Sequence, residues 1–240
     1  MEDRTQGLLK VLVSAPIVDL TAEAGARSRK KPPDSPNQYR SHQIYPAIYI
    51  NPEEKKIILL PGRLTTWKGQ EMFLEALSKL KTSEPEKKFY AIILGSDQGR
   101  KIYKKKLQRL VEQYRLINEI RFIDNFELMP LAYKISDIVV SSSIEPEAFG
   151  RVSIEAQSME KPIVASNIGG SKETIIDEKT GFLFPAGDAD KLSEKISNIF
   201  DLSETTLNYM GTEGRKNVIT KFNVEKMCIS TYSEYKKLLN

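Results

Sequence analysis

The chain has 240 residues, 40% of them hydrophobic and 28% charged, which is the composition of a globular protein with one large or two small domains. The net charge of +4 permits anionic ligands or a membrane surface, but acidic residues are nearly as numerous as basic ones, so we expect no nucleic-acid partner. With one cysteine the chain can form neither an internal disulfide nor a cysteine metal cluster, which fits the reducing cytoplasm. No apolar run approaches the length of a membrane span, and no convincing signal peptide is found.

Residues 1–54 differ in character from the rest and are predicted to be an extension or linker, partly disordered. Residues 8–13 could form one short strand, and residues 44–50 an extended lead-in. Residues 27–36 between them are basic, rich in proline and without periodicity. A solvated tail is the favoured interpretation of this basic stretch, and an arm touching anionic lipid at the inner membrane face is the alternative. His42 lies in the same region without neighbours that would support a catalytic role.

From residue 55 to residue 240, short apolar runs alternate with helical stretches, and we predict one domain there. The expected strands cover residues 57–60, 90–94, 120–123, 137–141, 162–166 and 181–184. The expected helices cover residues 70–80, 102–116 and 128–135, a stretch starting near 150, a stretch from 188 to 200, and residues 224–239. Continuous apolar strands separated by helices favour an α/β, Rossmann-like parallel sheet with helices on both faces. Such sheets bind ligands outside the carboxyl ends of their strands.

One of these carboxyl-end loops contains the sequence S-S-S-I-E-P-E-A-F-G-R-V-S-I-E, residues 141–155. Gly150 at the helix entrance lets backbone approach a ligand, and the free N–H groups of the following turn attract a phosphate. Glu147 precedes the helix, and Glu155 lies a little over one turn inside it. Phosphate donors flanked by carboxylates suit a molecule with both phosphate and sugar parts. A solvated loop followed by an exposed helical glutamate is the competing interpretation.

The loop after the first strand reads P-G-R-L-T-T-W-K-G-Q. Gly62 permits a tight turn, and Arg63 and Lys68 place two cations on one loop. A pyrophosphate is bound well by a planar guanidinium, a mobile ammonium and a close backbone. Two solvated surface cations remain the alternative.

The pattern E-A-F-G-R-V-S-I-E resembles the E-x-F-G-x-x-x-x-E motif of retaining nucleotide-sugar glycosyltransferases with two Rossmann-like domains (the GT-B fold), most similar to family 4. The loop at residues 62–69 resembles the G-R-x-x-x-x-K-G element of the same family. Gly95 corresponds to its strand-ending glycine turn, and residues 122–125 to its F-x-G segment, with Asn125 in place of the glycine. The resemblance extends from about residue 54 to residue 239 and implies the C-terminal, donor-binding half of that fold.

The resemblance also implies roles for single residues. Arg63, Lys68 and Glu147 would be the catalytic residues, with the two cations neutralising the departing diphosphate and Glu147 positioning the sugar. The donor, a UDP or GDP sugar, would be bound by Gly62, Gly95, Phe122, Ile123, Phe149, Gly150, Arg151, Val152 and Glu155. No Asp-x-Asp metal motif follows a strand, so we expect neither a metal ion nor a separate cofactor.

The sequence departs from the family because about fifty residues cannot form its N-terminal acceptor domain. A fragment, a decayed gene product, and half of an enzyme completed by a separate acceptor-domain chain are the alternatives. A nucleotide-sugar-binding module without catalysis is the rival function. An NAD-type Rossmann protein is disfavoured, because no G-x-G-x-x-G follows the first strand, and a nucleotide-sugar epimerase would also need two domains.

Overall fold

The computed structural model describes residues 55–124 and 126–239. The expected strand at 8–13, the basic stretch at 27–36, the lead-in at 44–50, His42 and Asn125 lie outside the described residues. The boundary proposed between residues 54 and 55 therefore stays a prediction.

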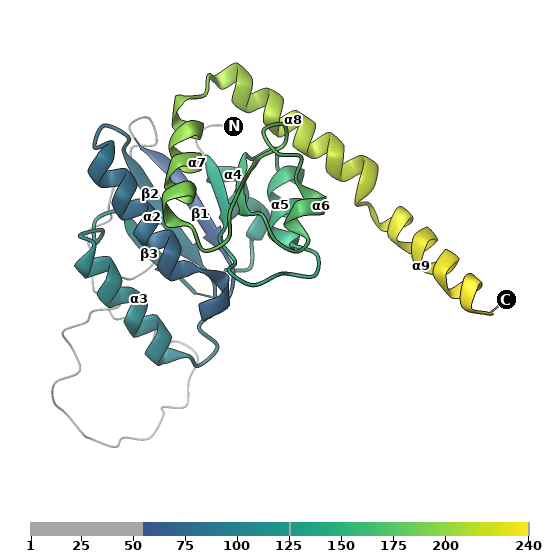
Figure 1. Ribbon diagram of the computed structural model, residues 1–240, viewed down its shortest axis with the longest axis horizontal. Helices are drawn as coiled ribbons and strands as arrows, with labels where there is room; N and C mark the ends of the chain where they lie inside the picture. The colour runs from purple at the N-terminus through teal and green to yellow at the C-terminus, as the bar shows by residue number, and fades with distance from the viewer. Residues whose placement is uncertain (1–54, 125, 240) are drawn as a thin grey trace, which may run out of the picture. The chain divides into compact units, whose positions relative to one another are not determined.

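The sheet has six parallel strands in the order β3-β2-β1-β4-β5-β6 (Figure 1). The strands are β1 (Lys56–Pro61), β2 (Phe89–Leu94), β3 (Ile120–Ile123), β4 (Ile138–Ser141), β5 (Ile163–Ser166) and β6 (Phe182–Phe184). Each agrees with the sequence expectation to within one residue. The chain first runs outward from β1 to β3 and then returns to place β4 on the other side of β1, where Ile58 pairs with Ile138. This reversal at β1 and β4 is the switch point at which open α/β sheets bind ligands.

Helices cover both faces of the sheet, as the continuous apolar strands predict. One layer contains α2 (Gln70–Ser83), α3 (Lys101–Gln113) and α7 (Ala189–Asp201); the other contains α4 (Met129–Ile135), α5 (Arg151–Ser158) and α8 (Glu204–Lys221). In β1, Ile58 and Leu60 join the core under α2 and α7, whereas Ile57 and Leu59 are equally buried toward the opposite face. Burial on both faces removes the need for polar residues in the strand, which explains its unbroken apolar run.

Three helices differ from expectation. α2 ends at Ser83 rather than at residue 80. α3 ends at Gln113 rather than at residue 116, because Arg115 adopts a left-handed conformation with φ 55°. Leu116 is nevertheless fully buried beyond the helix end. α8 was not predicted at all, and short helical segments not expected from the sequence occur at Thr66–Lys68 (η1) and Ser171–Thr174 (α6).

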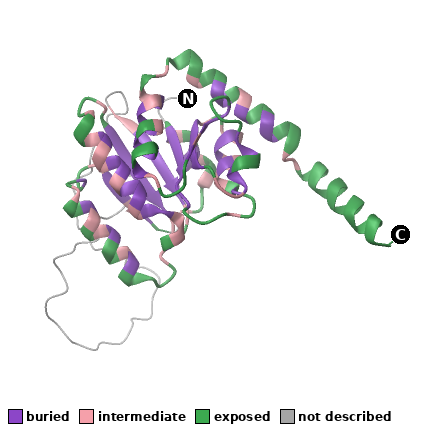
Figure 2. Cartoon of the chain, viewed as in Figure 1, coloured by how far each residue is buried: buried purple, intermediate pink, exposed green. Residues whose placement is uncertain are grey.

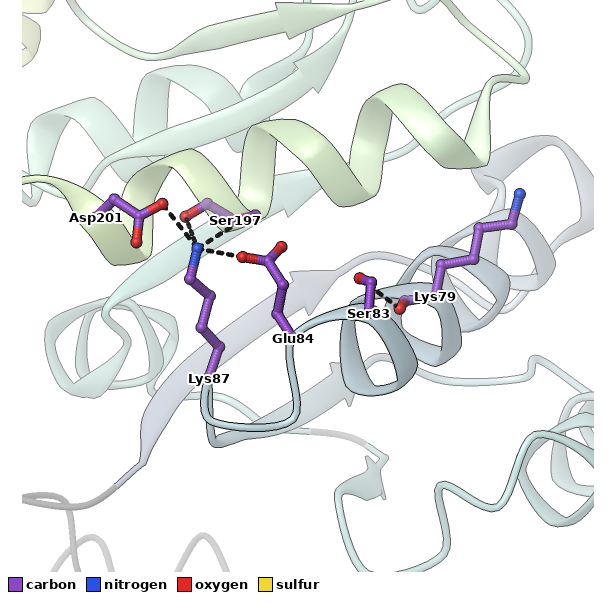
Figure 3. Close-up of polar contacts among 6 residues, drawn as sticks. All are labelled: Lys79, Ser83, Glu84, Lys87, Ser197 and Asp201. Carbon is purple, nitrogen blue, oxygen red and sulfur yellow. Dashed lines mark hydrogen bonds and ion pairs between the residues drawn. The ribbon is translucent and has the colours of Figure 1, made fainter.

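A cluster of charged side chains around Lys87 lies between α7 and the turn that joins α2 to β2 (Figure 3). The Lys87 ammonium lies 2.6 Å from Glu84 Oε2 and 2.7 Å from Asp201 Oδ2 at the end of α7. It also donates to Ser197 Oγ at 2.7 Å. Burial lowers the pKa of Lys87, but its hydrogen bonds to Asp201 and Glu84 outweigh that effect and raise the pKa. The lysine therefore connects α7 to the α2–β2 turn.

The last helix, α9 (Val224–Leu239), confirms the expected C-terminal helix and contains no buried residue (Figure 2). Among the helices of the described part of the chain, none is both long enough and apolar enough to cross a membrane. The described residues also contain no group of three or more His, Cys, Asp or Glu side chains arranged to hold a metal ion.

Candidate active site

The loops that follow β1, β2 and β3 are packed backbone to backbone at the carboxyl edge of the sheet. The Gly62 N–H donates to Leu94 O at 2.9 Å, and the Gly95 N–H donates to Ile123 O at 2.8 Å. A Cβ added at Gly95 would lie 2.1 Å from Gly62 O, so no side chain fits between these two loops. The structure thus brings Gly62, Gly95 and Ile123 to one edge, as predicted.

The loop after β1 also locks against the loop after β4. The Ile144 N–H donates to Trp67 O at 2.8 Å, and Ser142 Oγ donates to Lys68 O at 3.0 Å. Gly69 has φ 68°, and a Cβ there would lie 1.9 Å from Ser142 O. Only glycine combines this left-handed conformation with so close an approach.

The interlocked loops bring two of the three predicted catalytic side chains, those of Lys68 and Glu147, into contact. Lys68 Nζ donates to Glu147 Oε1 at 2.6 Å, and the buried Ser143 hydroxyl donates to the same oxygen. The side chains of Lys68 and Glu147 are 13% and 19% exposed, so solvent screens the pair only partly. Lys68 Nζ also lies 4.7 Å from the centre of the Trp67 ring.

Arg63 has a fixed backbone and an exposed side chain. Its carbonyl accepts a hydrogen bond from the buried Gln70 amide at 2.8 Å, and Gln70 in turn accepts from Tyr103 OH at 3.1 Å. The guanidinium carbon lies 5.9 Å from the centre of the Trp67 ring. Within the described residues no ion pair joins Arg63 or Arg151 to a carboxylate of the motif, so both cations are available to an anionic ligand.

Helix α5 begins directly behind Glu147. Gly150 has φ 74° and precedes the first helical residue, Arg151, without a side-chain cap. The first N–H groups of a helix lack intrahelical acceptors, which leaves those of Arg151 and Val152 available to an anion. Phe149 is 47% exposed and meets the Phe222 ring edge to face at 5.9 Å.

Glu155 lies in the second turn of α5, and its Oε2 accepts a hydrogen bond from Tyr133 OH at 2.6 Å. Tyr133 belongs to α4 and is 2% exposed. Burial, together with the Glu155 hydrogen bond, raises the pKa of Tyr133 well above that of a free tyrosine, so its hydroxyl stays a donor.

The side chains at the end of β3 are turned largely into the core of the protein. Phe122 is partly buried against the core, and Ile123 is buried. A cavity of about 580 Å³ lies nearby between residues 65–67 and the N-terminal turn of α3, and Trp67, Arg100, Lys101 and Lys106 are among its lining residues. Three of these lining side chains are basic, and one of them, Lys106, is paired with Glu71 Oε2 at 2.6 Å.

Sequence reasoning missed two residues of this arrangement. Ser143 belongs to the S-S-S run directly before the motif, so its closeness to Glu147 in the chain could have indicated it. Tyr133 lies 22 residues before Glu155 on another helix, and no local pattern connects the two.

Comparison with known proteins agrees with this geometry. The family described as "Glycosyl transferases group 1" matches residues 42–217, which is more than half of the chain. A D-inositol 3-phosphate glycosyltransferase of Jonesia denitrificans is 30% identical over 73% of this chain and 40% of that protein. Spore coat protein SA of Bacillus subtilis is 30% identical over 76% of this chain and 49% of that protein. The chain thus spans less than half the length of these relatives.

Solved structures share the fold. A glycosyltransferase from Rickettsia africae superposes with a TM-score of 0.71 at 37% identity, over 78% of this chain and 48% of that one. Alr3699/HepE from Anabaena, solved with UDP and glucose, gives a TM-score of 0.68 at 26% identity, over 76% of this chain and 49% of that one. The six-stranded parallel sheet, the loops at its carboxyl edge and these similarities together show that the chain belongs to the group 1 glycosyltransferases, which use the GT-B fold.

Proposed function

We propose that residues 55–239 form the donor-binding domain of a retaining glycosyltransferase that uses a UDP or GDP sugar. The Lys68–Glu147 contact is the observation that carries the proposal, with Glu147 four residues before Arg151, the first residue of α5. A cation for phosphate, a carboxylate for sugar hydroxyls and a helix N-terminus in one loop cluster would together suit a nucleotide sugar. The relative crystallised with UDP and glucose supports the same class of donor.

In the proposed mechanism, Arg63, Lys68 and the amides of Gly150 to Val152 hold the diphosphate. Charge grows on the diphosphate as the bond to the sugar breaks, and donors already in place stabilise that charge without reorganising. In the present structure the Lys68 ammonium donates a hydrogen bond to the Glu147 carboxylate. A bound diphosphate would compete for that ammonium, while Ser143 would continue to hold Glu147 beside the sugar.

Other parts of the proposal concern the whole protein. The acceptor would be held by a second domain, because the relatives are about twice as long as the matched region. A separate chain carrying that domain is one source of it, and a cytoplasmic enzyme acting at the inner membrane face in envelope polysaccharide or glycolipid synthesis is the role we favour. A nucleotide-sugar-binding module without catalysis is the second candidate.

The test is calorimetry with UDP, GDP and the matching nucleosides. Lys68→Ala should weaken diphosphate binding by about 1–3 kcal/mol, the value of a charge-assisted hydrogen bond, and change nucleoside binding little. Lys216→Ala on α8 removes the same charge from an exposed side chain and serves as the control. Equal losses for diphosphate and nucleoside would contradict the phosphate role. Turnover of a UDP or GDP sugar, with and without a supplied acceptor domain, separates the enzyme from the binding module.

A further inference from the structure

We propose that Tyr133 is a positioning residue that holds the Glu155 carboxylate in place for the ribose of the donor. The inference rests on the proposed function, in which Glu155 accepts hydrogen bonds from ribose hydroxyls. It adds a residue of α4, outside every motif of the sequence, to the binding site.

The contact between the two residues is constrained mainly from the tyrosine side. Tyr133 OH donates to Glu155 Oε2 at 2.6 Å. The Tyr133 ring is buried, and its own carbonyl accepts a hydrogen bond from the Ser136 hydroxyl at 2.7 Å. Glu155 is only half-buried, so the more deeply buried tyrosine is the better-anchored partner and orients the glutamate.

The hydrogen bond leaves the second oxygen of the Glu155 carboxylate for a ligand. Oε2 is occupied by Tyr133, whereas Oε1 has no hydrogen-bond partner among the residues that the structure describes. A carboxylate oxygen accepts more than one hydrogen bond, and the vicinal hydroxyls of a ribose are suitable donors. A ligand that meets a carboxylate already held in one orientation does not lose binding energy to ordering that side chain.

The raised pKa of Tyr133 is consistent with this role. Burial and the Glu155 hydrogen bond raise the pKa of Tyr133, so the phenol keeps the proton that it donates to Glu155 Oε2. The alternative role for the contact is purely structural, since it also joins α4 to α5. The two roles differ in what they predict for ligands that lack ribose hydroxyls.

The experiment measures how well the full chain distinguishes ribose. UDP or GDP, whichever binds more tightly, is compared by calorimetry with its 2′,3′-dideoxy counterpart. Tyr133→Phe removes only the hydroxyl, and we expect it to weaken binding of the ribose form by about 10-fold, as for one charged hydrogen bond, and of the dideoxy form by less than 2-fold. The preference of the wild-type chain for the ribose form should shrink accordingly.

Two further variants make the result specific. In a Glu155→Gln background, Tyr133→Phe should have little additional effect on that preference, because residues acting through one another are not additive. Tyr103→Phe is the matched control, since Tyr103 is also buried and its hydroxyl donates to Gln70 at 3.1 Å. Because Gln70 also donates to the Arg63 carbonyl, any loss of diphosphate binding in this variant should be equal for the ribose and dideoxy forms, which leaves the preference for ribose unchanged.

The outcomes separate the inference from the proposed function. If Tyr133→Phe lowers the melting temperature but keeps the wild-type preference for ribose, the contact is structural and the inference is overturned. If the wild-type chain binds the diphosphate without preferring ribose, the inference fails while donor binding stands. If the wild-type chain binds neither UDP nor GDP, the proposed function fails together with the inference.

Discussion

At the scale of single residues, the candidate site depends on glycines, which have no side chain, as much as on charged residues. Gly69 and Gly95 stand where two backbones cross, and a Cβ at either position would lie within 2.1 Å of a carbonyl oxygen of the neighbouring loop. The contact between Lys68 and Glu147 exists because these crossings are so close. The chemistry of the motif therefore depends on packing that the charged residues themselves do not provide.

We predict that Gly69→Ala lowers the free energy of unfolding by about 2–4 kcal/mol, combining the cost of a left-handed alanine with that of overpacking. Gly187→Ala is the control, because Gly187 has φ 85° but a Cβ there would meet nothing within 4 Å. It should show the backbone cost alone, about 1–2 kcal/mol. Urea unfolding of both variants measures the difference, and equal losses would show that the crossing with Ser142 is unimportant.

At the scale of elements, α8 is the helix that supports the motif helix from behind. Gly211 lies against the Glu160 carbonyl, and Gly214 against the Gln157 side chain, so α8 approaches α5 closely. A buried amide network reinforces the contact: Gln157 donates to Thr174 O at 2.8 Å, and Asn217 donates to Gln157 Oε1 at 3.1 Å. This packing fixes the orientation of α5 and thereby of Glu155.

We predict that Gly211→Ala destabilises the protein by about 1–3 kcal/mol although alanine is the better helix former, because its Cβ would lie 2.4 Å from Glu160 O. Thr212→Ala on the exposed side of the same helix should instead be neutral or slightly stabilising. Thermal unfolding of the pair measures both effects. A gain in stability from Gly211→Ala would mean that α8 and α5 are less closely packed than described.

At the scale of the whole described domain, long-range contacts join segments more than a hundred residues apart in the chain. The Lys87 cluster ties α7, which follows the last strand, to the turn before the second strand. The chain covers less than half of the length of the matched relatives. Substitutions at Lys87 measure how much this cluster contributes to the stability of the domain.

We predict that Lys87→Met lowers the free energy of unfolding by about 1–2 kcal/mol, because Glu84 and Ser197 would lose a shared, largely buried donor. Lys79→Met should cost less, since Lys79 pairs with Asp190 and Glu75 at an exposed position. Chemical denaturation of both variants checks the order. A larger loss for Lys79→Met would contradict the role given to burial.

The sequence alone determined the class of fold and most element boundaries. Strands such as β1 are buried on both faces, so their continuous apolar runs predict them without knowledge of the neighbouring strands. The parallel sheet then predicts that ligands bind at the loops after the carboxyl ends of these strands. The spacing of Glu147, Gly150 and Glu155 was readable for the same reason, since these residues lie in one loop and helix. α8 was missed because Gly211 and Gly214 weaken its helical signal, and packing on α5 overrides that local preference.

The tertiary structure decided which of these residues meet. Lys68 and Glu147 are 79 residues apart, and their contact depends on β4 returning to pair with β1 rather than with β3. Tyr133 reaches Glu155 only because α4 and α5 pack on the same face of the sheet. Strand order and side-chain contacts between helices depend on the packing of the whole core, and no local pattern in the chain encodes them.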